Sequence, residues 1–256
     1  EHFFLFGNII HSGEGRLSAT LGNAAFMGAF TLAQFFICLI LFLQKKEWWW
    51  RLIFIIFGLL DFFILFQTQT RGALLSLFAV SLLISGFYAL KGFDKKRRII
   101  GASILALVVF IAGFIFLNRD SDWVKNNSTL NRLVNISAKD ITTESRMLAW
   151  DTSWKGWKDR FLFGYGWENY NVAFNKYFHA EIFKDSGSQL WFDRAHNTIF
   201  DVAVATGIFG LISYLSIFGL ALYLLLKNKN KNFDLYLLIA GLLLAHFLQN
   251  IFVFDV

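Results

Sequence analysis

The sequence predicts an all-α, polytopic membrane protein built as a bundle of about six spanning helices. Hydrophobic residues make up 56% of the chain, and the mean hydropathy is +0.51, which is far from the balance of a soluble domain. Apolar runs long enough to cross a bilayer also alternate with short basic loops. The net charge of +6 therefore indicates membrane topology and not a nucleic-acid partner.

Six apolar segments approach or reach the roughly 20 residues that a helix needs to cross a bilayer, the second being the shortest. They are residues 24–43, 52–66, 73–90, 99–117, 208–226 and 233–252. A turn of a few polar residues separates the second from the third, which predicts an antiparallel hairpin. Because the run 197–226 exceeds one crossing, we expect its first part to be a shallow or re-entrant piece. The chain contains no proline, so helix breaks must come from glycine or polar residues.

The distribution of basic residues predicts the orientation of the bundle. Three clusters fall on alternate loops and so on one face, which is expected to be cytoplasmic. The clusters are Lys45, Lys46 and Arg51; Lys91 with residues 95–98; and Lys227, Lys229 and Lys231. The opposite, extracytoplasmic face then carries residues 1–23, expected to be a surface loop, together with the 67–72 turn and residues 118–196.

Residues 118–196 form a polar segment that holds eleven of the 24 Lys and Arg residues and ten of the 18 acids. We expect a single membrane domain over residues 1–256, the C-terminal part of a longer protein, with this segment inserted as an extracytoplasmic loop between spans four and five. Its first part is expected to be irregular. A helix is predicted from Thr142, which would cap it, with Glu144 favourable to the helix dipole.

An aromatic stripe marks one face of that predicted helix. Its members are Met147, Trp150, Trp154, Trp157 and Phe161, at helical spacing. The stripe could pack against the spanning helices, or the helix could lie in the membrane interface with its tryptophans beside a lipid substrate. The two interpretations are compatible, and the second makes Trp150 a substrate-binding candidate.

Three positions on the outer face are candidates for chemistry. Arg71 lies between two apolar spans, where it could simply extend to the membrane rim. Arg146, placed in the first turn of its helix, could pair with Glu144, Asp151 or Asp193. His196, where polar loop meets apolar run, could equally be structural. Arginines bind diphosphates and a neutral histidine is a competent base, so together the three suit a lipid diphosphate substrate.

The sequence motifs resemble those of the O-antigen ligase (Wzy_C) family of membrane glycosyltransferases. The motifs, in order, are RLSATLGNAAFMGAF, TQTRGALLSLFAVSLLI, ESRMLAW with FLFGYGWENY, and AHNTIFDVAVATGIFGLISYL. The resemblance implies a GT-C-like helix bundle and an enzyme that moves a glycan from undecaprenyl diphosphate to an acceptor hydroxyl. The acceptor would be lipid A core, another glycan or protein Ser/Thr. The sequence carries no metal-ligand motif, and no cofactor is expected.

The resemblance also implies roles for individual residues. Arg71 and Arg146 would hold the diphosphate, and His196 would act as base on the acceptor, so that displacement inverts the anomeric carbon. Thr70 stands where family members often have serine. Further binding candidates are Arg16, Asn23, Asn197, His246 and Asn250. A transporter or flippase of lipid-linked glycans is the alternative, although it would need no base and should carry charges at membrane depth, where Asp61 is the clearest.

Overall fold

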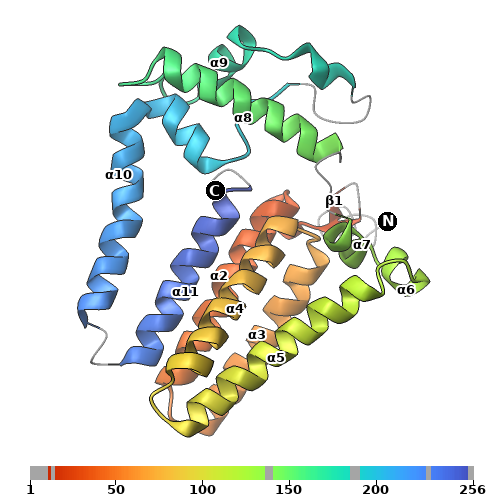
Figure 1. Cartoon of the computed structure of the whole chain (residues 1–256), viewed down its shortest axis with the longest axis vertical. Helices are drawn as coiled ribbons and strands as arrows, with labels where there is room; N and C mark the ends of the chain where they lie inside the picture. The colour runs from red at the N-terminus through yellow and green to blue at the C-terminus, as the bar shows by residue number, and fades with distance from the viewer. Residues whose placement is uncertain (1–10, 13–14, 136–140, 185–190, 229–231, 253–256) are drawn as a thin grey trace. The chain divides into compact units, whose positions relative to one another are not determined.

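The computed structural model describes residues 11–12, 15–135, 141–184, 191–228 and 232–252. Within them, six helices are long and apolar enough to cross a membrane, which confirms the predicted polytopic all-α protein (Figure 1). These are α2 (Ala24–Gln44), α3 (Trp48–Gln67), α4 (Arg71–Lys91), α5 (Lys95–Leu117), α10 (Thr198–Asn228) and α11 (Phe233–Asn250). A short antiparallel pair, β1 (His11–Ser12) with β2 (Arg16–Leu17), and the 3-10 turn η1 (Ala19–Leu21) precede them.

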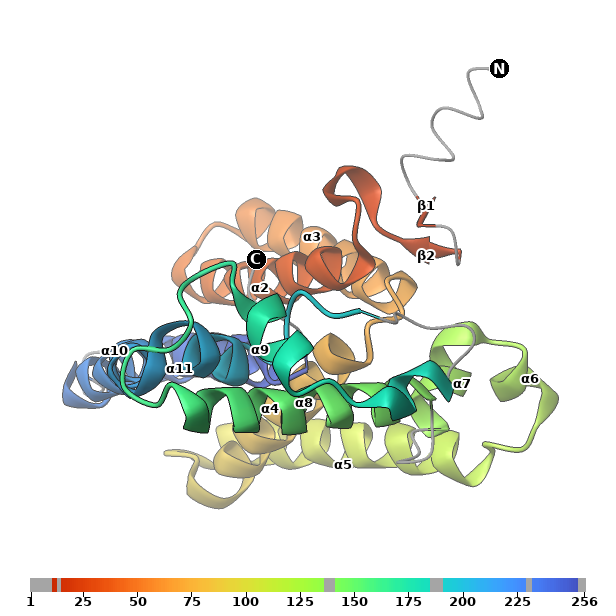
Figure 2. The same ribbon diagram turned by 90° about the horizontal axis from the view of Figure 1, so that it is seen from above.

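The chain forms two compact units. The first comprises Glu1–Asn135 and Leu225–Gln249, and the second comprises Ile136–Leu224 and Asn250–Val256. In the first unit, helices α2 to α5 and α11 run side by side, as Figure 2 shows from above. Its buried core joins α2, α3, α4 and α11. The core members are Leu32, Phe36, Leu65, Ala73, Leu77, Val80 and Ala245.

The remaining faces of these helices are apolar and outward. On α5, Phe110 and Leu117 are 66% and 84% exposed, and a helix with such a surface is stable only where lipid replaces water. The same helix approaches α4 closely at Gly101, where a Cβ would lie 2.5 Å from the Tyr88 Cβ. A glycine at this point therefore permits the α4–α5 contact.

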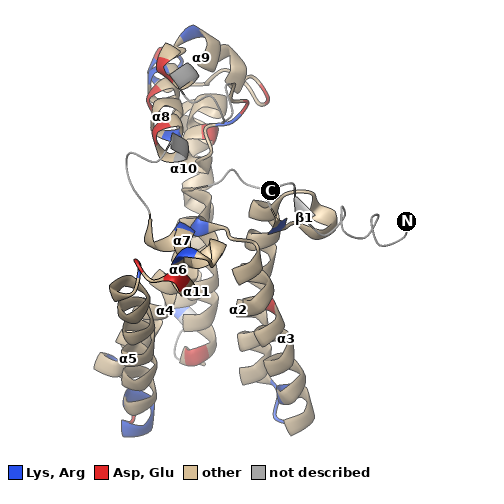
Figure 3. Cartoon of the chain, turned by 90° about the vertical axis from the view of Figure 1, so that its right-hand side faces the viewer, with Lys and Arg blue, Asp and Glu red and all other residues tan. Residues whose placement is uncertain are grey.

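Basic residues gather at one end of the first unit. Consecutive helices α2 to α5 reverse direction at short turns, so residues 45–51 and 91–98 lie at the same end, and Figure 3 shows the basic ends of α3 and α5. Arg71 begins α4 at the opposite end. Of the third predicted cluster, Lys227 lies in the last turn of α10, whereas Lys229 and Lys231 lie outside the described residues.

The second unit is built on α8 (Ile141–Asp159), which packs against α9 (Tyr170–Lys176), with η2 (Ala180–Lys184) following. Its buried core lies between these helices and the first part of α10. The core members are Ala149, Tyr165, Tyr170, Ala173, Phe174, Ile182, Phe192, Ala195 and Val204. At the helix contact, a Cβ on Gly156 would stand 2.8 Å from the Ala173 Cβ, so α8 and α9 touch through their small residues.

The first part of the polar segment was expected to be irregular. It instead forms two short helices, α6 (Asp122–Lys125) and α7 (Ser128–Val134). The Asn127 side chain caps α7 by accepting from Leu130 N at 3.0 Å, and the Thr129 hydroxyl donates to the Phe66 carbonyl at 3.0 Å. Such short helices carry no hydrophobic period and depend on caps. Helix α8 begins at Ile141, so Thr142 lies inside it and is not its cap.

The expected break in the long apolar run is confirmed at Gly207, whose φ of 67° and ψ of −161° interrupt α10. Three main-chain hydrogen bonds dock residues 161–166 onto this break: Tyr165 N to Val204 O, Gly166 N to Ala205 O and Ile208 N to Phe161 O, each 2.8 Å. A Cβ on Gly207 would collide with the Leu162 carbonyl, and one on Gly164 with the Val204 carbonyl. The two glycines thus allow backbone to pack on backbone.

Candidate active site

His196 occupies the turn that precedes α10, in a left-handed backbone conformation with φ 53°. This conformation is uncommon for a residue with a side chain and carries strain. Asn197 follows as the helix cap, its Oδ1 accepting from Ile199 N at 3.0 Å and Phe200 N at 3.3 Å. The start of α10 therefore holds the strained histidine in place.

The residue before the histidine is fixed from two sides. The Asp201 Oδ1 accepts from Ala195 N at 2.6 Å, and the Trp150 Nε1 donates to Ala195 O at 3.0 Å. Ala195 is fully buried. One turn of α10 and one tryptophan of α8 thus hold both peptide groups that lead into His196, and buried polar groups satisfied in this way set a single local geometry.

The His196 imidazole is held in one orientation and in its neutral form. Its Nδ1 lies 3.3 Å from the Arg194 carbonyl oxygen. Because a carbonyl oxygen can only accept a hydrogen bond, Nδ1 carries the proton and Nε2 carries the lone pair of the neutral ring. The ring packs edge-on against Phe192, with centroids 5.4 Å apart. Burial lowers the pKa of His196, and the positive charge of Arg146 lowers it further against the smaller opposing effects of the Arg194 carbonyl and Asp193. A neutral imidazole near pH 7 can accept a proton.

Arg146 lies on α8, half-buried, with its Nη1 donating to the Phe252 carbonyl at 3.2 Å. The sequence predicted that Arg146 lies in the first turn of its helix. Arg146 is instead the sixth residue of α8. Asp151, one of the three acids considered as a partner of Arg146, contacts Lys155 and His179. The charge of Arg146 is close enough to influence the imidazole of His196, so the structure brings these two predicted site residues together.

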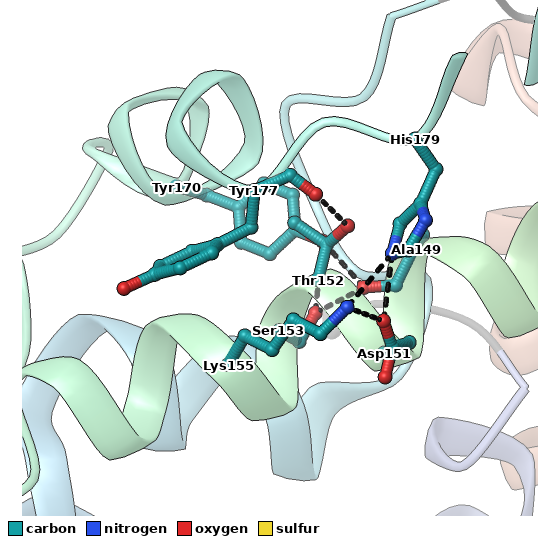
Figure 4. Close-up of polar contacts among 8 residues, drawn as sticks. All are labelled: Ala149, Asp151, Thr152, Ser153, Lys155, Tyr170, Tyr177 and His179. Carbon is teal, nitrogen blue, oxygen red and sulfur yellow. Dashed lines mark hydrogen bonds and ion pairs between the residues drawn. The ribbon is translucent and has the colours of Figure 1, made fainter.

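Asp151 takes part in a polar network that fastens α8 to the loop after α9 (Figure 4). It lies 2.5 Å from the Lys155 Nζ and 2.6 Å from the His179 Nε2. The hydrogen bond from Lys155 lowers the pKa of Asp151, and the one from His179 adds to the effect. Next to it, the Thr152 hydroxyl donates to the Tyr177 carbonyl at 3.2 Å. This network gives α8 a fixed place from which to present Arg146.

The aromatic stripe of α8 is divided between two environments. Trp150 and Trp157 pack against the core of the second unit. Met147, Trp154 and Phe161 are exposed by 53%, 44% and 45%. The stripe thus contains both packed and exposed side chains. Trp150, which was predicted to bind substrate, is one of the packed residues, and it forms a hydrogen bond to the residue before His196.

In the first unit, Arg71 begins α4 directly after a compact turn. The Thr70 hydroxyl donates to the Ala24 carbonyl at 2.9 Å, while Arg16 donates through Nε to the Thr68 carbonyl at 3.1 Å and through Nη2 to the Thr70 hydroxyl at 3.4 Å. Arg16 therefore binds the turn that directly precedes Arg71. Asn23, another candidate, caps α2 by accepting from Ala25 N at 2.8 Å.

A cavity of about 290 Å³ lies in the second unit and is lined by residues on both sides of His196 in the sequence. We call it the Trp167 cavity. Its lining consists of Trp167, Glu168, Arg194, Thr198, Asp201, Val202 and Tyr214. Sequence reasoning missed this feature, because its walls come from three separate segments. The signal available was Asp201, an acid in an apolar run.

Comparison with known proteins places the chain in a family. The family model described as O-Antigen ligase matches residues 56–215, a range that contains Arg71, Arg146 and His196. The chain belongs to the O-antigen ligase family. It is also similar to the ComP-specific O-oligosaccharyltransferase of Acinetobacter baylyi, with 31% identity over 251 residues. That match covers 94% of this chain, and the chain spans only 41% of the length of that relative.

The O-antigen ligase match joins residues from both units. It covers Trp150, Asn197 and the Trp167 cavity, while Arg16 and Asn23 precede it. His246 and Asn250, both on α11, follow it. Family membership was predicted from the order of the motifs, and the match confirms it.

Proposed function

We propose that this O-antigen ligase family protein transfers a glycan from an undecaprenyl-diphosphate-linked donor to an acceptor hydroxyl. The reaction would take place at the outer face of the bacterial inner membrane, on the side of the polar segment. The observation that carries the proposal is the neutral, oriented imidazole of His196 under the influence of the Arg146 charge. Membership of the family and the six membrane-spanning helices support it.

In the proposed reaction, His196 Nε2 takes the proton of the acceptor hydroxyl as its oxygen attacks the anomeric carbon. The bond from that carbon to the diphosphate oxygen breaks, and the diphosphate leaves with the electron pair. Arg146 and Arg71 stabilise the departing charge through several N–H donors each. A single displacement inverts the anomeric carbon, and the scheme assigns no step to a metal or cofactor.

The remaining candidates support these three residues. Asn197 and Trp150 position His196 through the cap and the Ala195 carbonyl. Arg16 orders the turn in front of Arg71 through its two hydrogen bonds, and we propose that it also contributes to donor binding. The lipid chain of the donor would lie in the surrounding membrane, beside the exposed residues of the α8 stripe.

The name of the Acinetobacter relative suggests which acceptor to test first. That protein is an O-oligosaccharyltransferase specific for ComP. Among lipid A core, another glycan and a protein Ser/Thr, we therefore propose a protein hydroxyl as the first acceptor to assay. Lipid A core and a lipid-linked glycan serve as the comparison acceptors in the same assay.

The test is reconstitution of the full chain in lipid vesicles with a lipid-diphosphate glycan, following release of glycan from the lipid. We expect His196→Gln to slow transfer by roughly 100- to 10,000-fold, the usual contribution of a general base, with unchanged donor affinity. Arg71→Ala and Arg146→Ala should weaken donor binding, while Arg71→Lys and Arg146→Lys restore part of it. Full transfer by His196→Gln would refute the base assignment. Movement of intact donor across the bilayer without glycan release would favour a flippase.

A further inference from the structure

The Trp167 cavity contains a buried carboxylate oxygen that nothing in the described part of the chain satisfies. Asp201 is 6% exposed and uses Oδ1 to hold Ala195 N at 2.6 Å. Its Oδ2 is buried and has no hydrogen-bond partner among the described residues. Leaving such a group without a donor costs about 1–3 kcal/mol or more for a charged group. A ligand hydroxyl or ammonium in the cavity would remove this cost.

The charge of the cavity identifies the chemistry of its ligand. Glu168 and Asp201 contribute two negative charges when ionised, against one positive charge from Arg194. That guanidinium is already occupied by Glu168, with Nη2 and Oε1 2.5 Å apart. The balance of −1 and the engaged arginine are unfavourable to a diphosphate or an acidic sugar. They favour a ligand rich in hydrogen-bond donors.

The volume and the aromatic walls of the cavity indicate more closely which class of ligand it binds. A volume of about 290 Å³ equals roughly ten water molecules at about 30 Å³ each, which is the scale of one monosaccharide ring. Trp167 and Tyr214 supply flat apolar surface, and Trp167 is 59% exposed, so one of its faces is accessible. Aromatic rings pack against the C–H faces of a sugar ring, while polar groups at the edge bind its hydroxyls.

We propose that the Trp167 cavity binds one neutral or amino-sugar ring of a substrate glycan, through Asp201 and Trp167. The inference rests on the proposed glycan transfer, because Arg194, Thr198 and Asp201 surround His196 in the chain. The sugar belongs either to the donor glycan or to a glycan acceptor. In both cases the cavity keeps a sugar ring next to the histidine, and its walls determine which sugars are used.

Binding is tested without turnover, on the full chain in nanodiscs, by saturation-transfer NMR. The probes are methyl glucoside, methyl glucosaminide, methyl glucuronide and inorganic pyrophosphate. We expect methyl glucoside and methyl glucosaminide to bind the wild-type protein. Methyl glucuronide and pyrophosphate should bind the wild-type protein no better than they bind the Trp167→Ala variant. Trp167→Ala should weaken glucoside binding roughly tenfold, which corresponds to about 1.4 kcal/mol. Trp191→Ala, another exposed tryptophan of the second unit that does not line the cavity, is the matched control.

Asp201→Asn is the second variant. Its amide oxygen can still accept from Ala195 N, so the turn before His196 is preserved while the negative charge is lost. We expect the preference for glucosaminide over glucoside to disappear in this variant. Equal probe binding in wild type, Trp167→Ala and Asp201→Asn would overturn the proposal, and so would tighter binding of glucuronide than of glucoside.

Kinetics distinguish the two sources of the sugar. If the donor glycan fills the cavity, Trp167→Ala raises the KM for donor, and if an acceptor glycan fills it, the same variant raises the KM for that acceptor. An unchanged KM for both would contradict the proposal. Should the full chain transfer no glycan at all, the proposed function fails on its own, while the probe-binding result still decides the sugar site.

Discussion

The indole nitrogen of Trp150 donates a 3.0 Å hydrogen bond to the main-chain carbonyl of Ala195. A tryptophan whose helical spacing allowed either packing or a place in the membrane interface thereby holds the peptide that leads into the proposed base. We therefore expect Trp150→Phe, which keeps an aromatic ring and loses the N–H, to lower kcat for transfer by roughly 10- to 100-fold through misplacement of His196.

The donor KM should stay unchanged in Trp150→Phe, because no substrate contact is lost. Trp154→Phe is the matched control, since Trp154 lies on the same helix and is 44% exposed. A Trp150→Phe variant with wild-type kcat, measured by steady-state transfer in vesicles, would show that the hydrogen bond does not position the base.

The pKa of His196 predicts the pH dependence of transfer. Because burial and Arg146 lower it below 6.5, the imidazole stays neutral until the pH falls beneath that value, and the acid limb of the rate profile should lie below pH 6.5. Arg146→Gln removes one positive charge and should move the limb upward, whereas Arg146→Lys should leave it near its wild-type position. The transfer rates of the wild type and of the two Arg146 variants, measured from pH 5 to 8, provide the comparison.

The same shift has a consequence for stability. In the unfolded chain His196 binds a proton below pH 6.5, while in the folded protein it resists protonation to a lower pH. Its contribution to stability is therefore complete above pH 6.5 and is lost as the pH falls from there through the folded pKa. His196→Gln should flatten this part of the profile of unfolding temperature against pH. An unaltered slope would mean that the histidine titrates alike in both states.

The break at Gly207 should tolerate no side chain. Gly207→Ala forces a positive φ on alanine and a collision with the Leu162 carbonyl. We expect a loss of about 1–3 kcal/mol or more in stability and a lower unfolding temperature in detergent. Gly219→Ala on the same helix meets nothing within 4 Å and should cause no loss. Equal melting of the two variants would argue against the docked geometry of residues 161–166.

Thr70 replaces the serine expected from the family resemblance, and the structure explains why both residues suit the position. Its hydroxyl donates to the Ala24 carbonyl and accepts from Arg16, which a serine hydroxyl can do as well. Thr70→Ser should therefore keep stability and donor affinity. Thr70→Val keeps the shape without the hydroxyl and should cost about 1–3 kcal/mol. Donor binding and chemical unfolding, measured on both variants, check this.

Hydropathy was sufficient to predict the spans, because a helix in lipid must satisfy its backbone internally and show an apolar surface. The break in α10 was anticipated from an apolar run too long for one crossing. Helices α6 and α7 were not predicted, since four and seven residues are too short for a periodic pattern. The start of α7 depends on a single cap, Asn127. The nearness of Arg146 to His196 came from the motif resemblance, and the composition gave no indication of it.

The Trp167 cavity could not be anticipated for a different reason. Trp167 and Tyr214 are 47 positions apart and meet only because residues 161–166 bind the backbone of the broken helix. No period or motif encodes that encounter. Sequence reasoning proposed Arg71, Arg146 and His196 from the chemistry of their own side chains. The cavity instead depends on which residues become neighbours in the fold.

Residues 161–166 are docked on α10 by three main-chain hydrogen bonds at two glycines, together with the buried side chain of Tyr165. The path of this backbone therefore depends on residues 161–166 and not on the side chains that follow them. Trp167 and Glu168 follow directly after residues 161–166, so we expect that these two residues of the cavity wall can be substituted without displacing His196. This arrangement makes the protein a promising scaffold for engineering sugar preference, with residues 167 and 168 as the first positions to randomise.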